Sequence, residues 1–423
     1  MKKFIAIWIG ELISNIGSGM TAFAISIYVY QLTRSATWVS VVALLAFAPT
    51  ILLNPFGGIL ADRYDRRLLM ICGDFFSAVG LLVIIICMQS GYTGVIPICI
   101  GVTISSIFLG LLEPAYKATI TELLPKEEFA KASGLVQLAG ASKYLVSPLI
   151  AGLLLSSIGI KGILIIDILT FFVTVFVLVI VRRNVNNIKL KQSDFNFFRE
   201  FQEGIRSITA DKGISSLVLL MTFTCFFLAF MQTLLAPMIL AFSNSKVLGI
   251  MESVSAVGML IGSVIIASLN IKRNYSKILI FSLMAAGIFM ALAGTTTHIG
   301  LLAAFCILFF AALPFVNTCA DVLIRVRVSN EMQGRVWGII SVITQAGYVA
   351  AYAVCGVLAD YVFEPMLTKE GILAGNIGRI IGIGEGRGIG FMLIITGIIM
   401  FAFAVIFGSR KSIKEMENEL ANN

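Results

Sequence analysis

Histidine and charged side chains are the scarcest components of this 423-residue sequence. A single histidine is present, His298, and 13% of the residues are charged, against roughly 25% in an ordinary soluble domain. Histidine-dependent acid–base chemistry or a histidine metal site would need more, so we predict that the chain is not an enzyme and holds no metal. A Gly-Lys-Ser/Thr phosphate loop is also missing, which argues against ATP hydrolysis by this chain.

The sequence is unusually rich in apolar residues. They make up 58% of the chain, and the mean hydropathy is +0.98. A soluble core cannot absorb that much apolar surface, so the surplus must face lipid. Because lipid offers the backbone no hydrogen-bond partners, the spanning elements must be helices or a closed barrel. Long unbroken apolar runs exclude the barrel and predict an all-α membrane protein.

Twelve segments are long and apolar enough to cross a bilayer, which takes about 20 residues per helix for a ~30 Å hydrocarbon core. All seven cysteines fall inside these segments, where a free cysteine behaves as a small hydrophobic residue, so we predict no disulfides. The predicted spans cover residues 4–30, 37–60, 68–89, 94–116, 131–157, 162–181, 214–241, 247–269, 277–295, 299–323, 335–359 and 388–408.

Lysine and arginine are distributed unevenly among the connections. If the N-terminus is cytoplasmic, 23 of the 31 basic residues lie in inside segments and 6 in outside segments, while Lys117 and Lys143 lie within or at the ends of spans. This asymmetry follows the positive-inside rule. We therefore predict a multi-pass plasma-membrane protein with both termini in the cytoplasm. The positive charge tracks membrane sidedness, so it does not indicate a nucleic-acid partner.

The longest polar stretch, residues 182–213, divides the spans into two sets of six. We predict an N-terminal bundle over 1–181, a cytoplasmic linker over 182–213, and a C-terminal bundle with a cytoplasmic tail over 214–423. Phenylalanine and isoleucine recur in the linker at roughly helical spacing, which favours a short amphipathic helix on the membrane surface; a plain linker is the alternative. The residues concerned are Phe195, Phe197, Phe198, Phe201, Ile205 and Ile208.

The two halves resemble each other in sequence. Pro114 and Pro314 are 200 residues apart, and Ala151-Gly152-Leu153 resembles Cys355-Gly356-Val357 at an offset of 204. The pattern Glu128-x-x-Lys131-x-x-Gly134 is similar to Glu331-x-x-x-Arg335-x-x-Gly338. Their shared order favours two parallel six-helix repeats with a substrate path between them.

The connection after the second span is unusually rich in charge and glycine. It reads Gly57-Gly58-Ile59-Leu60-Ala61-Asp62-Arg63-Tyr64-Asp65-Arg66-Arg67. Glycine at 58 would let two helices approach closely, and a plain positive-inside loop would explain the arginines but neither the acid nor the glycines.

This loop resembles the signature loop of the major facilitator superfamily, Gly-x-Leu-Ala-Asp-Arg-x-Gly-Arg-Arg, with Asp65 in place of the second glycine. The resemblance implies the major facilitator fold and a gating role, in which the acid and the arginines pair with helix ends and hold the cytoplasmic side shut. Asp74, early in the third span, is a plausible partner for an arginine. The gating residues that the resemblance implies are Gly58, Asp62, Arg63, Arg66, Arg67 and Asp74. The corresponding region of the second half keeps Gly262 but has lost the acid.

A second resemblance is partial. Drug:proton antiporters of the superfamily carry a glycine-rich motif in span 5, and this chain keeps Gly134, Pro148 and Gly152 as helix-packing residues, whereas Lys143 stands where a further glycine would be. The overall layout is similar to the macrolide-efflux and siderophore-exporter branch. Lys143 would then be a cavity cation that binds an anionic substrate group or a carboxylate; the alternative is a lysine that snorkels to the membrane surface.

Ionisable groups inside a membrane cost about 2.5–3.5 kcal/mol on insertion scales and usually face a cavity or a partner. The membrane carboxylates are Glu11, Asp74, Glu113, Asp167, Glu252 and Asp321. A proton-coupled carrier needs a carboxyl that takes up and releases protons as access alternates. Most of the six lie near span ends, where a structural role is the alternative. The coupling and substrate-path candidates, besides Lys143, are Glu113, Glu252, Asp321, Asn15, Gln232 and Asn317.

These features together predict a secondary active transporter that exports an amphipathic small molecule, such as a drug, a macrolide-like or a siderophore-like compound, by alternating access. A proton or ion gradient would supply the energy, so no cofactor is expected. The partners would be the substrate, protons and the lipid bilayer, with the protein acting as a monomer. Two alternatives stay open: an importer with the same fold, and a membrane sensor or scaffold that does not transport.

Overall fold

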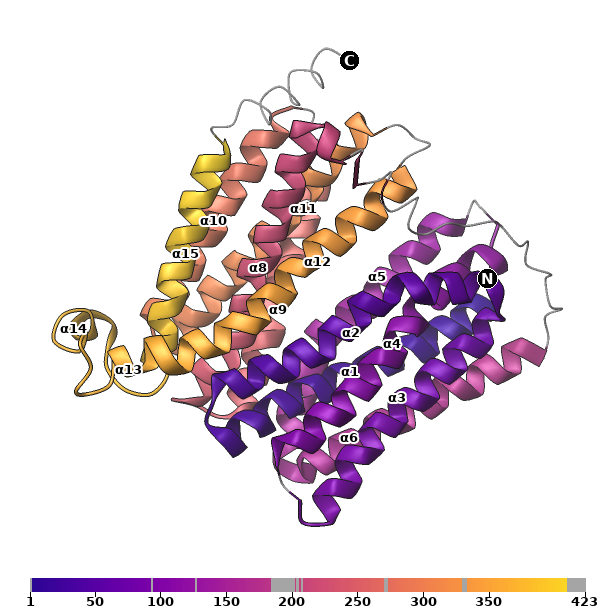
Figure 1. Cartoon of the computed structure of the whole chain (residues 1–423), viewed down its shortest axis with the longest axis horizontal. Helices are drawn as coiled ribbons and strands as arrows, with labels where there is room; N and C mark the ends of the chain where they lie inside the picture. Colours follow the sequence, from indigo (N-terminus) through magenta and orange to yellow (C-terminus); the bar gives the residue numbers. More distant parts are fainter. Residues whose placement is uncertain are drawn as a thin grey trace. The chain divides into compact units, whose positions relative to one another are not determined.

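Long helices form almost all of the computed structural model (Figure 1). The structure describes residues 2–92, 94–125, 128–183, 202, 205–206, 208–269, 273–328 and 333–408. The predicted linker helix lies mostly outside these residues, as do the C-terminal tail and Glu331. No strand occurs among the described residues. The predicted all-α membrane fold is therefore confirmed.

The chain divides into two compact units, which are described separately. Unit 1 comprises residues 1–193 and 243–253, and unit 2 comprises residues 194–242 and 254–423. The division therefore falls within residues 182–213, but residues 243–253, which include the start of the eighth predicted span, group with the N-terminal bundle rather than with the C-terminal bundle.

Unit 1 contains six helices. They are α1 (Lys2–Thr33), α2 (Ala36–Arg63), α3 (Arg66–Gln89), α4 (Val95–Leu123), α5 (Phe129–Leu145) and α6 (Ser147–Arg183). Two of the helix starts are capped by side chains: Ser35 accepts a hydrogen bond from the Trp38 amide, and Asp65 accepts one from the Arg67 amide. Such caps satisfy amides that have no partner within the helix.

Helix α6 is too long to cross a membrane once. The apolar stretch that begins in α5 and ends in α6 covers 48 residues, from Gly134 to Val181, or about 72 Å at 1.5 Å per residue. At Gly159 the backbone leaves the helical conformation, with φ 66° and ψ −179°. The turn at this glycine divides the apolar segment into the fifth and sixth predicted spans. Because no polar connection interrupts the segment, it counts as one of the 11 apolar segments in the described residues that are long enough to cross a membrane.

Hydrogen bonds to α1 show that the chain reverses direction near Gly159. Trp8 donates to the Leu135 carbonyl, and further along α1 the Ile16 carbonyl accepts from Ser147. Both partners advance together, so residues 135–147 run parallel to α1. Further along the chain, Thr174 donates to the Gly10 carbonyl and Ser18 donates to Asp167, so this part runs antiparallel. Two crossings follow, and the prediction of twelve transmembrane helices is confirmed.

Unit 2 repeats this plan. Its long helices are α8 (Lys212–Leu240), α9 (Ser245–Ser268, shared with unit 1), α10 (Tyr275–Thr295), α11 (Ile299–Arg327), α12 (Gln333–Leu358) and α15 (Arg387–Gly408). Between α12 and α15 lie a π-helix (Ala359–Phe363) and the short helices α13 (Glu364–Met366) and α14 (Gly378–Ile381). His298 is the exposed N-cap of α11.

Equivalent helices pack in equivalent pairs within each unit. In unit 1, α3 packs against α4 and α6; in unit 2, α10 packs against α11 and α15. Likewise, α1 packs against α6, and α8 packs against α15. This correspondence agrees with the two parallel repeats inferred from the sequence.

Candidate functional site

The charged loop between α2 and α3 is a compact turn rather than an extended linker. Asp65 Oδ1 accepts a hydrogen bond from the Arg67 amide at 3.0 Å. Arg66 donates to the Ala61 carbonyl at 3.2 Å and to the Ala118 carbonyl of α4 at 2.8 Å. The guanidinium of Arg66 therefore ties the end of α2 to α4 and satisfies carbonyls near both helix ends, where acceptors are left unpaired.

The close helix contact expected at Gly58 occurs at Gly57 instead. A Cβ atom added at Gly57 would lie 2.9 Å from the carbonyl oxygen of Gly110 on α4, whereas one added at Gly58 would meet nothing within 4 Å. Gly57 faces α4 within unit 1, and Gly58 points elsewhere. The Asp62 side chain lies outside the described atoms, and Arg63 is exposed. The gating role of these residues stays a prediction.

Asp74 makes no hydrogen bond or ion pair with a loop arginine among the described residues, contrary to the expectation from the sequence. Its side chain is 1% exposed, and its Oδ2 atom is buried without a hydrogen-bond partner. The Asp74 carboxyl interacts electrostatically with those of Glu11 on α1 and Asp167 on α6. Arg67 is buried on the same helix, about 10 Å earlier at 1.5 Å per residue.

Glu11, Asp74 and Asp167 form a buried acidic cluster inside unit 1. Glu11 is 5% exposed and Asp167 is 1% exposed. Glu11 Oε1 and Asp74 Oδ2 are buried without a hydrogen-bond partner, and so is the hydroxyl of Tyr116 on α4, which interacts electrostatically with Glu11. Buried polar atoms usually find partners. Three partnerless oxygen atoms around one interior region therefore mark a site.

Asp167 has the most polar surroundings of the three carboxyls. Ser18 of α1 and Thr170 of α6 each have a hydroxyl 3.4 Å from Asp167 Oδ1. The Lys143 ammonium on α5 also interacts electrostatically with Asp167. Among the described contacts no ion pair or hydrogen bond joins Lys143 to a carboxylate, so its role as a cavity cation stays a prediction. Its side chain is half-buried in the last turn of α5.

The cluster extends along the interior of the bundle instead of converging on one point. Among the residues that the structure describes, no three acidic, histidine or cysteine side chains are close enough to hold a metal ion. Asp167 lies level with Ser18, about 7 residues or ~10 Å along α1 from Glu11 at 1.5 Å per residue. A second cation, Arg67, is buried near the start of α3, the helix that carries Asp74.

Two of the predicted coupling carboxylates are instead paired on helix surfaces. Glu113 lies 2.7 Å from Lys117 and Asp321 lies 2.7 Å from Arg325, each pair being one helical turn apart. All four side chains are more than a third exposed. Exposed pairs of this kind contribute about 0–1 kcal/mol to stability, and the coupling role of Glu113 and Asp321 stays a prediction.

The remaining path candidates lie on several helices. Asn15 of α1 donates to the main-chain carbonyl oxygen of Glu11 at 2.7 Å. Glu252 and Gln232 are half-buried on α9 and α8, and Asn317 is exposed on α11. Their part in the substrate path stays a prediction.

Small residues pack α6 tightly at Gly152 and Pro148, as predicted. A Cβ atom added at Gly152 would lie 2.9 Å from the Ser245 carbonyl oxygen and 3.2 Å from the Gly249 Cα. A Cβ atom added at Gly249 would clash with the Pro148 carbonyl oxygen. Gly134 differs, because an added Cβ there would meet nothing within 4 Å. No close helix contact depends on Gly134.

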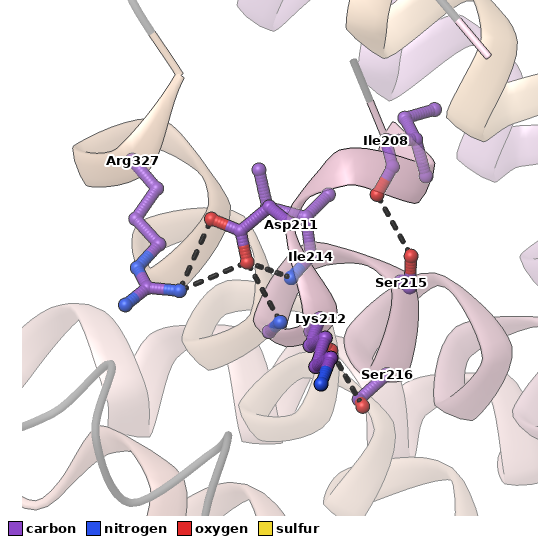
Figure 2. Close-up of polar contacts among 8 residues, drawn as sticks. Ile208, Asp211, Lys212, Ile214, Ser215, Ser216 and Arg327 are labelled. Atoms are coloured by element: carbon purple, nitrogen blue, oxygen red, sulfur yellow. Dashed lines mark hydrogen bonds and ion pairs between the residues drawn. The ribbon is translucent and has the colours of Figure 1, made fainter. Parts of the chain in front are cut away.

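In unit 2, an ion pair joins the start of α8 to the end of α11 (Figure 2). Arg327 Nη1 lies 2.9 Å from Asp211 Oδ1 and 3.1 Å from Asp211 Oδ2. Asp211 also accepts hydrogen bonds from the Gly213 and Ile214 amides, at 2.7 and 3.1 Å, and so caps α8. The second half therefore holds its helix ends together through Asp211, although it lacks the acid of the signature loop.

Comparison with known proteins agrees with this architecture. The sequence profile of the Major Facilitator Superfamily matches residues 7–360. The chain belongs to the major facilitator superfamily. Macrolide efflux protein A of Streptococcus pyogenes is 30% identical over 344 residues, which cover 80% of this chain and 84% of that protein. Macrolide efflux protein A of Enterococcus faecalis is 28% identical, over 70% of this chain and 93% of that protein.

Solved major facilitator structures share the fold at low sequence identity. A bacterial homologue of the human lysosomal transporter Spinster superposes with a TM-score of 0.73 at 14% identity, covering 98% of this chain and 97% of that one. A bacterial homologue of the iron transporter ferroportin gives a TM-score of 0.72, also at 14% identity, covering 97% and 99%. This chain is accordingly a membrane transporter and not an enzyme.

The sequence shows which carboxylates lie in predicted spans, but it does not show which of them share one interior region of the folded protein. Glu11 and Asp167 are not among the coupling candidates that the sequence suggests, and nothing in the sequence singles out Tyr116. Each looks like an isolated polar residue in an apolar span. The sequence feature that points to this region is a set of small hydroxyl residues at 18, 170 and 174, which lie at the contact between α1 and α6.

Proposed function

We propose that this major facilitator transporter exports an amphipathic small molecule, of the macrolide or a related drug class, in exchange for protons. The observation that carries the proposal is the similarity to proteins named for macrolide efflux, which extends over four-fifths of the chain. The signature loop alone would not distinguish export from import. The similarity in length and sequence to two such relatives favours export.

The acidic cluster supports proton coupling. A carboxyl exists as an anion or as a neutral acid, and the free-energy difference between these forms depends on its access to water and to other charges. Glu11, Asp74 and Asp167 are sealed from solvent in this structure and interact with one another. A conformational change that admits water to the cluster would therefore change the number of protons bound. Coupling requires such a change.

Alternating access then proceeds by movement of the two repeats around a central site. In the proposed orientation both termini are cytoplasmic, as the 23-to-6 distribution of basic residues favours. The loop at 57–67 would close the cytoplasmic side through Asp62, Arg63 and Arg67. Protons would reach the cluster and leave it on opposite sides of the membrane.

A cellular export assay tests this function. The chain would be expressed in a bacterium that lacks its own drug exporters, and the accumulation of a radiolabelled macrolide would be measured. We expect lower accumulation than in cells with an empty vector, and the difference should disappear when a protonophore collapses the proton gradient. Increased accumulation would indicate import. Unchanged accumulation across a panel of macrolides and other drugs would contradict the proposal.

A further inference from the structure

An open apolar groove of about 630 Å³ lies on unit 2 between α10 and α11, beside the end of α9. Its volume falls within the ~300–1,000 Å³ range of ligand sites. The helices α10 and α11 contribute Phe281, Ser282, Ala285, Leu308, Ala311, Ala312 and Phe315.

One end of the groove carries positive charge. Lys277 lines it from the first turn of α10 and is exposed, as is the nearby Arg273. Among the described residues neither side chain has an ion-pair or hydrogen-bond partner. Among the lining residues that the structure describes, the lysine alone is charged, and the others are apolar except for Ser282. The groove is thus amphipathic along its length.

The apolar part of the groove is exposed to the surroundings of the bundle. Phe281, one helical turn after Lys277, is 74% exposed. Lys277, Phe281 and Ala285 follow one face of α10 at i, i+4 and i+8, so the groove extends about 12 Å from the charged end into the apolar zone. In a chain that spans a membrane, this surface is continuous with the lipid-facing surface.

We propose that the groove binds an anionic phospholipid, with an acyl chain between α10 and α11 and the headgroup phosphate on Lys277. Charge complementarity at one end and continuity with the lipid phase along the rest identify the occupant. The charged end lies on the same side of unit 2 as Asp211, because α9 returns to the side from which α8 starts. The lipid therefore belongs to the cytoplasmic leaflet in the proposed orientation, although its binding does not depend on transport.

Native mass spectrometry of the full-length protein tests the proposal. Delipidated protein would be titrated with phosphatidylglycerol or with phosphatidylcholine of the same acyl chains. We expect a bound phosphatidylglycerol that Lys277→Gln weakens by about fivefold, since the attraction of one basic residue to anionic lipid is ~1 kcal/mol. Lys246→Gln, at an exposed lysine in the first turn of α9, should leave binding unchanged.

A second pair of variants tests the acyl-chain part of the groove. Ala285→Phe fills the hollow and should reduce binding of both lipids, whereas Ile288→Phe, on an exposed side chain of the same helix outside the lining, should not. Equal binding of the two lipids by the wild-type protein would overturn the proposal, as would phosphatidylglycerol binding that Lys277→Gln leaves unchanged. If Ala285→Phe fails to fold, the Lys277 comparison decides alone.

Discussion

Asp167 is set apart from the other membrane carboxyls by its neighbours. It has hydroxyl groups on two helices and a lysine within electrostatic range, while Glu11 and Asp74 have partnerless oxygen atoms. Glu113 and Asp321, by contrast, are each paired with a basic residue at a helix surface. We therefore expect proton coupling at the buried carboxyls rather than at the carboxyls paired on helix surfaces.

Replacing Asp167 by asparagine tests this distinction. The amide side chain would still accept hydrogen bonds from Ser18 and Thr170 but would not take up a proton. We expect Asp167→Asn to fold and to lower macrolide export from cells by roughly tenfold or more. Asp321→Asn is the matched control and should export like the wild type, because its surface pair contributes little. Equal export by the two variants would contradict the role of the cluster.

Asp211 combines a helix cap with an ion pair, and two substitutions separate the contributions. Asp211→Asn retains the cap but loses the charge, so we expect the free energy of unfolding to fall by about 0–1 kcal/mol. Asp211→Ala loses both the cap and the charge and should lower the free energy of unfolding by about 0.5–2 kcal/mol more. The apparent melting temperature in detergent would therefore fall in the order wild type, asparagine, alanine. An asparagine variant as unstable as the alanine variant would show that the ion pair dominates.

At the scale of elements, hydropathy predicted the spans well but missed how the fifth is built. The predicted segment 131–157 is divided between α5 and the first part of α6, with the break at Val146. Hydropathy stays high through the break, but Ser147-Pro148 follows it directly. Proline lacks the amide hydrogen that would continue the helix, so this dipeptide marks the break where hydropathy does not. The turn at Gly159 differs from the break at Val146, because its positive φ of 66° is a backbone conformation that favours glycine.

Substitution at Gly159 should destabilise the protein through backbone strain alone. A Cβ atom there would meet nothing within 4 Å, yet the φ/ψ region is nearly exclusive to glycine and costs other residues of order 1–3 kcal/mol. We expect Gly159→Ala to lower the melting temperature in detergent. Gly134→Ala, on an exposed helical glycine with the same open space, should leave the melting temperature unchanged or raise it slightly. Equal effects would contradict this account of the turn.

The two glycines that begin the signature loop should also differ. Gly57→Ala forces α2 away from α4, since the new Cβ would lie 2.9 Å from the Gly110 carbonyl oxygen. We expect a lower melting temperature and less folded protein in size-exclusion chromatography. Gly58→Ala has room within unit 1 and should be as stable as the wild type. The opposite order would mean that Gly58, as the sequence pattern suggested, makes the packing contact.

At the scale of the whole molecule, the sequence allowed the helix count, the repeat and the family to be predicted, because each depends on patterns along the chain. The acidic cluster could not be predicted in the same way. Its members come from α1, α3 and α6, and only the packing of these helices shows that Glu11, Asp74 and Asp167 face a common interior. Similarly, Asp74 is close to the loop arginines in sequence, but seven residues, or about 10 Å along α3, separate it from Arg67.

The central claim is that outward transport of a drug is coupled to proton binding at this cluster. The most direct measurement is the proton flux in proteoliposomes that contain a pH-sensitive dye, after addition of a macrolide, for the wild type and Asp167→Asn. The account predicts macrolide-dependent proton movement in the wild type and none above empty liposomes in the variant. Macrolide transport without proton movement in the wild type, or equal proton movement in the variant, would contradict it.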